Sequence, residues 1–146
     1  GDGYSVHSSL YDFDSRTRTL VERIERFGSA IEPREIPGTD IVHWDFHPGS
    51  LLTEEGSLVA VVDTDFAMIG DATFDLVALA LTSLSLRCEP GVRARLSSYA
   101  LDYLDSAPTQ AYLAHLFLRL IDWPIRRGRL HEVEFWLSKA DELLLI

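Results

Sequence analysis

The side chains best suited to chemistry lie between residues 43 and 75. Two short polar runs in this segment carry carboxylates: His43, Asp45, His47 and Ser50 form the first, and Asp63, Asp65, Asp71 and Asp75 form the second. Carboxylate oxygens are preferred ligands of Mg²⁺, which commonly takes one or two of them together with substrate phosphates. Two such loops that converge would hold a magnesium ion and supply a base.

A short β-hairpin is the element that must position these runs. Strand and turn residues alternate over short ranges: a β-like entry at 41–42, a Pro-Gly turn at 48–49, strands at 51–52 and 58–62, and a turn at 54–56. Loops that flank one hairpin can meet at its open end, so we expect Asp45 and Asp63 to lie close together.

Helical periodicity dominates the rest of the chain. Asp14 or Ser15 is placed to cap a helix over roughly 15–28 that Gly28 ends. Further helices are expected at 74–87, 91–105, 109–127 and 129–145, with aromatic residues such as Tyr112, Phe117, Trp123 and Trp136 in the core. Residues 1–13 are expected to be a loose segment and 29–40 a surface loop. The fold class is therefore mainly α with a small β-hairpin, and the length predicts one domain.

Charge and cysteine content limit the partners and the compartment. The formal net charge is −10, from 23 acidic and 13 basic residues. Such a chain repels phosphate backbones and favours a cationic ligand, so nucleic acid is not expected as a partner. The single cysteine, Cys88, fits a reducing cytoplasm. No export signal is visible, and the longest apolar stretch is too short for a membrane helix, so we expect a cytoplasmic protein without a membrane partner.

The two polar runs carry a specific resemblance. HWDFHPGSLL is followed by VVDTDFAMIGDATFDLVALAL, and Asp63 stands 18 residues after Asp45. This pair resembles the aminoglycoside phosphotransferase family, relatives of choline kinases and protein kinases. Family members show H-x-D-x-H-x-x-N, then a strand ending in I-D-x-D/E, then G-D-P-x-x-D-L-A. RLIDWPIRRGRLHEVEFWL resembles the family's last helices less distinctively, so the resemblance covers about residues 15–146.

The resemblance implies that residues 14–146 form the C-terminal, helical lobe of a protein-kinase-like α+β fold. A catalytic loop would span 43–50, a metal-binding loop 63–71, and C-terminal helices 74–146. The N-terminal ATP lobe is expected to be absent, since the chain has no glycine-rich phosphate loop and its one lysine, Lys139, falls in the last expected helix. We therefore expect the isolated chain to be inactive and to bind its missing lobe, or a second copy, through the lobe-facing surface.

Catalytic and metal roles follow from the same resemblance. Asp45 would accept or orient the proton of the attacking hydroxyl, and His43 would brace its loop. Asp63 would hold magnesium, with Asp65 as a further metal residue. Ser50 stands where the family has a metal-binding asparagine. Its alternative is a turn serine bonded to backbone.

The nucleotide would be ATP, with Leu52 and Val62 flooring the adenine pocket. Asp75 would tie the central helix to the catalytic loop by hydrogen bonds. The chain departs from the family pattern at Trp44, where glycine is most frequent, and at Ala72, where proline is usual.

Three functions remain open at this point. The first is an ATP- and Mg²⁺-dependent phosphotransferase acting on a hydroxyl of an aminoglycoside or another antibiotic. The second is a pseudokinase or interaction module without catalysis. The third is a phosphatase of the haloacid dehalogenase type, with Asp63 as nucleophile and Asp65 as acid, for which a trapped aspartyl-phosphate would be diagnostic. A transition-metal site on His43, Asp45 and His47 is a weaker alternative.

Overall fold

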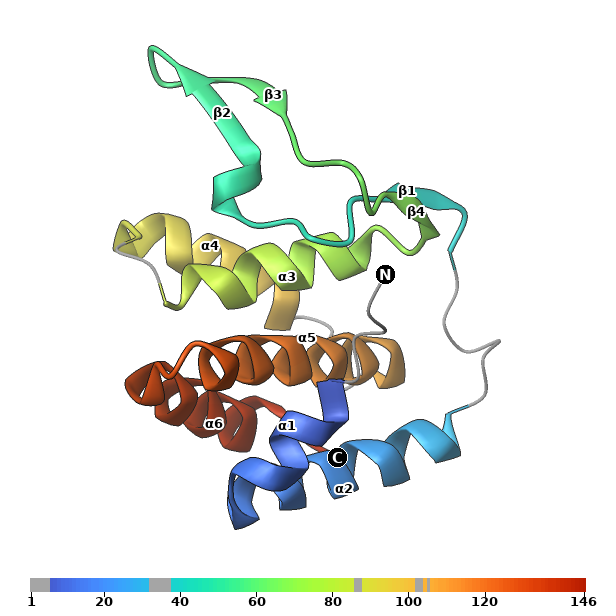
Figure 1. Ribbon diagram of the computed structural model, residues 1–146. Helices are drawn as coiled ribbons and strands as arrows, with labels where there is room; N and C mark the ends of the chain where they lie inside the picture. The colour runs from blue at the N-terminus through green and yellow to red at the C-terminus, as the bar shows by residue number, and fades with distance from the viewer. Residues whose placement is uncertain (1–5, 32–37, 86–87, 102–103, 105) are drawn as a thin grey trace. The chain divides into compact units, whose positions relative to one another are not determined.

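The computed structural model describes residues 6–31, 38–85, 88–101, 104 and 106–146. Its elements along the chain (Figure 1) are α1 (Val6–Phe13), α2 (Ser15–Ala30), β1 (Asp40–Val42), the 3₁₀ turn η2 (Pro48–Ser50), β2 (Leu51–Glu54), β3 (Ser57–Val61), β4 (Met68–Gly70), α3 (Thr73–Ser83), α4 (Pro90–Leu101), α5 (Ala107–Arg126) and α6 (Leu130–Leu143). These elements fall into two compact units. We call α1, α2, α5 from Gln110 onward and α6 the helical unit, and the elements between residues 33 and 109 the hairpin unit.

Helix α2 of the helical unit begins with a local capping signal. Asp14 caps α2 in a capping box: its carboxylate accepts from the Thr17 amide at 2.8 Å, and the Thr17 hydroxyl accepts from the Asp14 amide. The cap predicted from the sequence is thereby confirmed. The predicted end at Gly28 is wrong, because α2 continues to Ala30. A single glycine in a helix costs only about 1 kcal/mol, which packing elsewhere along the helix offsets.

The expectation of a loose start is wrong for residues 6–13, which form α1. Leu10 is fully buried, and Arg18 donates to the Tyr11 carbonyl at 2.9 Å. So short a helix is unstable in isolation and depends on tertiary contacts, which no local pattern reveals. Residues 1–5 of that expected segment, and 32–37 of the expected loop at 29–40, lie outside the described residues.

The interior of the helical unit is built by apolar faces of its helices. Tyr112, Phe117 and Trp136 are buried, as predicted, and the rings of Phe117 and Trp136 meet edge to face at 6.5 Å. Trp123 is 46% exposed, so its assignment to the core is wrong. Instead its ring receives the Arg127 guanidinium at 4.1 Å, a cation–π contact at the surface.

The hairpin unit contains two small antiparallel sheets. In the predicted hairpin, Leu51 pairs with Val61 and Leu52 with Ala60. Glu55 and Gly56 form its turn with φ of 50° and 80°, the left-handed pair that a tight hairpin requires. The second sheet pairs β1 with β4, and the sequence analysis missed it because a strand of three residues carries no periodicity.

Helix α3 provides the buried support of the hairpin unit and packs against α4. Its buried residues include Phe74, Val77 and Leu81, as expected for a central helix. It ends at Ser83, earlier than the predicted residue 87, although residues 86 and 87 lie outside the described ranges. No helix among the described residues is long and apolar enough to cross a bilayer.

Candidate functional site

The start of the first acidic loop is held by a carboxylate from α3. Asp75 accepts the backbone N–H of His43 at 2.6 Å on one oxygen and that of Trp44 at 3.1 Å on the other. Hydrogen bonds to an ionised acceptor are stronger than neutral ones. The expected tie between the central helix and the loop is therefore confirmed.

The residue before Asp45 has a backbone conformation that bulky side chains avoid. Trp44 has a φ of 72°, in the left-handed region, which costs roughly 1–2 kcal/mol for a non-glycine residue. Its indole stacks on Phe74, with ring centroids 4.5 Å apart and planes 12° from parallel. Phe74 is buried in the first turn of α3. The stack and the two Asp75 bonds thus hold this turn at the position where glycine is usual.

Phe74 was missed as a supporting residue by the sequence analysis. The available signal was an aromatic side chain directly before Asp75, the residue expected to tie the helix to the loop. Its ring stacks on a residue thirty positions earlier, so only tertiary structure shows the contact.

Val62 joins the two acidic segments. Its amide donates to the Ser50 carbonyl at 2.9 Å, and its carbonyl lies 2.8 Å from His43 Nε2. Both ends of the 43–50 loop are therefore bonded to the residue that immediately precedes Asp63. Asp63 itself has a left-handed φ of 65°. Strained backbone of this kind clusters at functional sites because the surroundings must stabilise it.

His43 lies inside the site and braces its loop. A carbonyl oxygen only accepts, so the nitrogen that faces Val62 carries the proton and donates. The other ring nitrogen, Nδ1, is buried without a hydrogen-bond partner. With the residue 7% exposed, its geometry suits holding the loop.

Ser50 and His47 shape the end of the same loop. Ser50 is 1% exposed, and its hydroxyl donates to the Asp45 carbonyl at 3.2 Å. This is the backbone-bonded geometry that the alternative for Ser50 predicted. His47 precedes η2, and its Nδ1 accepts the Gly49 amide at 3.0 Å. The bond orients the ring as a cap of the turn.

The carboxylates suited to magnesium differ in exposure. Asp63 and Asp65 are exposed, and Asp45 is half-buried. Among the described residues, no group of three or more His, Cys, Asp or Glu side chains is placed to hold a metal ion. Because Mg²⁺ takes one or two protein carboxylates and completes its shell with phosphates and water, the exposed pair suits this ion. Metal binding by Asp63, Asp65 and Ser50 remains a prediction.

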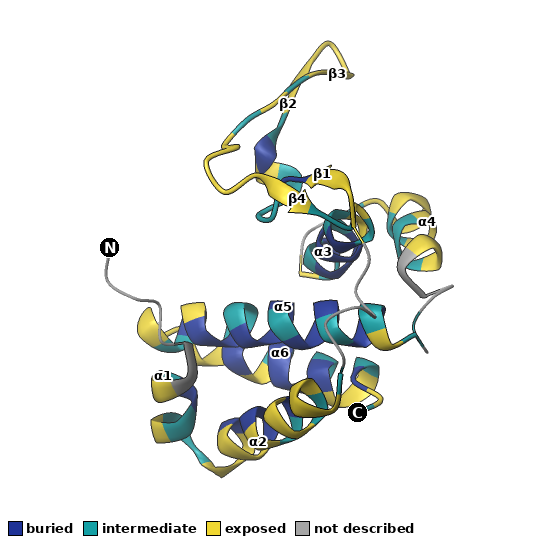
Figure 2. Ribbon diagram, turned by 90° about the vertical axis from the view of Figure 1, so that its right-hand side faces the viewer, coloured by how far each residue is buried: buried dark blue, intermediate teal, exposed yellow. Residues whose placement is uncertain are grey.

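The two residues predicted to contact the adenine ring lie on or next to an exposed hairpin: Leu52 is in β2, and Val62 directly follows β3. Leu52 is 47% exposed, and Val62 is half-buried. Leu58, Val59 and Val61 on β3 are also exposed, and Figure 2 shows most of the hairpin in the exposed colour. The hairpin therefore presents an apolar surface beside the loop that holds Asp45.

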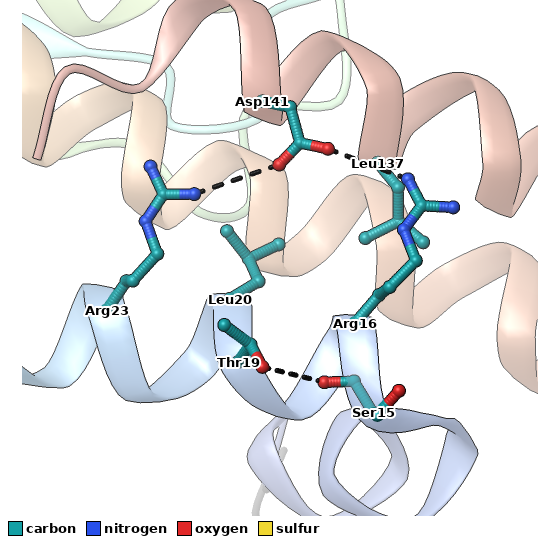
Figure 3. A pocket seen from close by; sticks show the side chains of 7 residues that line it. All are labelled: Ser15, Arg16, Thr19, Leu20, Arg23, Leu137 and Asp141. Atoms are coloured by element: carbon teal, nitrogen blue, oxygen red, sulfur yellow. Dashed lines mark hydrogen bonds and ion pairs between the residues drawn. The ribbon is translucent and has the colours of Figure 1, made fainter.

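The helical unit has a separate cleft between α2 and α6 (Figure 3). It encloses about 190 Å³ and is lined by Ser15, Arg16, Thr19, Leu20, Arg23, Leu137 and Asp141. Asp141 lies between Arg16 at 3.6 Å and Arg23 at 3.7 Å. The cleft contains none of the predicted site residues, and its charges are already paired.

Comparison with known proteins adds a family match and a fold. Residues 6–116 match the model of a family described as the phosphotransferase enzyme family. No curated protein sequence matches the chain. Among solved structures, a thermostable mutant of the aminoglycoside phosphotransferase APH(4)-Ia in its apo form matches with a TM-score of 0.66 at 17% identity, over 88% of this chain and 43% of the other.

Ternary complexes of thermostable mutants of the same phosphotransferase match as well. The complex with AMP-PNP and hygromycin B has a TM-score of 0.63, and the one with ADP and hygromycin B has 0.62, both at 17% identity and over 90% of this chain. These likenesses show a kinase-like fold, mainly helical with small antiparallel strand pairs, as predicted. The chain spans 43% of the length of these structures.

Proposed function

This chain belongs to the phosphotransferase enzyme family, and from that premise we propose that it is the catalytic-loop part of an ATP-dependent kinase for a small-molecule hydroxyl. Structures of similar fold were solved with AMP-PNP or ADP together with hygromycin B, which supports a nucleotide and a small-molecule substrate. The net charge of −10 favours a cationic substrate such as an aminoglycoside. The activity is proposed for the whole protein, and the isolated chain is proposed to be inactive.

The observation that carries this proposal is the double anchoring of Val62. Phosphoryl transfer needs positioning and charge neutralisation more than reactive protein groups. Since the residue before Asp63 is bonded to both ends of the Asp45 loop, the backbone supports two acidic segments as one unit. A phosphoryl-transfer site requires its acidic residues to be held in fixed positions in this way.

Each acidic residue has a distinct proposed role. Asp45 orients the substrate hydroxyl and accepts its proton, while His43 holds the loop. Asp63 binds Mg²⁺, with Asp65 as a second carboxylate. When bound, the ion neutralises charge on the nucleotide phosphates. No step requires a covalent intermediate on the protein.

The exposed hairpin is the proposed contact for the nucleotide and for the rest of the protein. Leu52 and Val62 would lie under the adenine ring. An isolated two-stranded hairpin is only marginally stable in water, and apolar side chains on it favour a covering partner. The proposed partner is the remaining lobe, and self-association is the competing outcome. Light scattering at high concentration distinguishes them, because a mass of one chain argues against self-association.

The deciding experiment measures ATP turnover by a longer protein that contains this sequence and an ATP lobe, against a panel of aminoglycosides. Asp45→Ala and Asp63→Ala should each lower kcat by roughly 10³-fold or more, since such groups act on the transition state. Asp12→Asn, which removes an exposed carboxylate on α1, is the matched control and should leave turnover unchanged. Full activity in both site variants would remove the assigned roles.

A non-catalytic interaction module is the second candidate, and the exposed apolar side chains of β2 and β3 favour it. It predicts no turnover in the longer protein with any substrate, together with stable association through the hairpin. Loss of that association in a Leu58→Ser variant, without any ATP turnover in the parent, would support this candidate over the kinase.

A further inference from the structure

Ser50 bonds to both acidic segments at once. Its carbonyl accepts the Val62 amide at 2.9 Å, and its hydroxyl donates to the Asp45 carbonyl at 3.2 Å. One residue therefore links the strand end before Asp63 with the backbone of Asp45.

The burial of Ser50 bears on what its hydroxyl can do. The residue is 1% exposed, so water-sized groups do not reach its atoms. Mg²⁺ usually keeps several waters and reaches proteins through one or two carboxylates. A ligand oxygen must therefore face the open side of the site. In addition, the hydroxyl of Ser50 donates to the Asp45 carbonyl, which orients the side chain toward that backbone.

We propose that Ser50 is a positioning residue that fixes the backbone of Asp45 against the segment of Asp63, and that it is not a metal ligand. This inference rests on the proposed roles of those two aspartates. In this role Ser50 holds the catalytic loop in place, and the exposed carboxylates of Asp63 and Asp65 bind the metal. Ser50 would then act in the same way whether or not a metal is bound.

Because the positioning role of Ser50 does not depend on metal, it can be tested in the metal-free protein. Amide hydrogen exchange of the 146-residue chain is followed by mass spectrometry in EDTA, on peptides covering residues 43–52 and 60–65. Ser50→Ala removes the hydroxyl bond to the Asp45 carbonyl and keeps the backbone bond to Val62. It should therefore raise exchange in the 43–52 peptide about fivefold, the effect of losing one buried hydrogen bond on local opening, and raise exchange in the 60–65 peptide by a smaller factor as the loop loosens. Ser57→Ala, at the exposed start of β3, is the matched control and should change neither segment.

Exchange in the 43–52 peptide of Ser50→Ala within about twofold of the unchanged chain would overturn the inference. So would an equal rise in the Ser57→Ala control. Should the alanine variant not fold, Ser50→Cys keeps the shape of the side chain with a weak donor, and a rise confined to the same two segments is again expected.

A Mn²⁺ titration followed by electron paramagnetic resonance separates this inference from the proposed function. Ser50→Ala should leave the Kd for Mn²⁺ unchanged, and a Kd raised about tenfold would overturn the positioning role in favour of ligation. Asp63→Asn should raise the Kd. An unchanged Kd for Mn²⁺ in Asp63→Asn would contradict the metal role of Asp63. The positioning role of Ser50 would then be judged from the hydrogen-exchange result alone.

Discussion

The two units of the chain differ in where they bury apolar and charged groups. Of the fourteen large apolar side chains exposed among the described residues, eleven lie in the hairpin unit. The non-glycine residues with positive φ in the described part, Trp44, Glu55 and Asp63, also lie there. Strain and exposed apolar surface are therefore concentrated in the unit that carries the candidate site. Such features are tolerated where a site or a partner requires them.

The helical unit shows the opposite character. Its apolar side chains are mostly buried, and its most buried charge is compensated inside the unit. Asp122, 1% exposed, accepts from the Ser9 hydroxyl and pairs with Arg126 Nε at 2.7 Å. The contacts that stabilise the helical unit are therefore different from those that hold the candidate site. Variants in the two units should therefore have separable effects.

The largest expected effect comes from the buried charge of the helical unit. Asp122→Ala should lower the free energy of unfolding by about 4 kcal/mol, because Arg126 and Ser9 each lose a hydrogen bond to a buried carboxylate, at roughly 2 kcal/mol per bond. Urea denaturation followed by tryptophan fluorescence measures the loss. The control is Asp141→Asn. The Asp141 side chain is 63% exposed, so this variant should lower the free energy of unfolding by under about 1 kcal/mol. Equal losses in the two variants would contradict the comparison.

The second effect is a pH dependence of the free energy of unfolding that arises from His115 in the helical unit. Burial, and then the charge of Arg119, lower the pKa of His115 from 6.5 to about 4. Between these values the unfolded chain binds a proton that the folded chain does not, so stability falls as the pH drops through this window. The loss should reach about 3 kcal/mol at pH 4.

Unfolding free energies at several pH values between 7 and 4 measure this dependence. His115→Asn should flatten the curve over that window by the same amount. His131→Asn is the control, because its side chain is 84% exposed and its removal should leave the slope as it was. A curve unchanged by His115→Asn would show that other groups cause the acid loss.

The third effect tests the hairpin unit through Asp75. Asp75→Ala should lower stability by about 2 kcal/mol, because the amides of His43 and Trp44 lose a charged acceptor. Asp75→Asn keeps one acceptor oxygen and should cost less. Chemical denaturation followed by near-ultraviolet circular dichroism is the measurement. Asp65→Ala, in an exposed loop, is the control, and a loss there as large as in Asp75→Ala would refute the bracing role.

The smallest effect tests the strain at Trp44. Trp44→Gly and Trp44→Ala both remove the stack on Phe74, but only glycine adopts a φ of 72° without strain. The alanine variant should therefore be less stable than the glycine variant by about 1 kcal/mol. Parallel thermal denaturation of the two variants checks this order. The reverse order would mean that the turn relaxes once the indole is gone.

Much of the candidate site could be predicted because its signals are local. The spacing of His43, Asp45 and Asp63 predicted two acidic loops around a hairpin, and the hairpin has the expected turn at residues 55–56. The cap at Asp14 was equally predictable, since its bonds run to a residue three positions away.

Contacts between distant residues account for the rest. The pairing of Ile41 with Ile69 creates β4, and burial of Leu10 stabilises α1, yet neither short segment shows a periodic pattern. The exposure of Trp123 was mispredicted because helical spacing alone does not say which face of a helix is covered.

The types of side chain, the order of the loops and the resemblance to the family could be read from the amino-acid sequence alone. Side-chain type and spacing suffice for these, because they depend on residues close together in the chain. The bonds from Val62 to both ends of the Asp45 loop, and the direction of the Ser50 hydroxyl, became visible only in the folded protein. The bonds of Val62 join residues that are neighbours only after folding, because a buried backbone polar group pairs with a partner that the fold brings within reach.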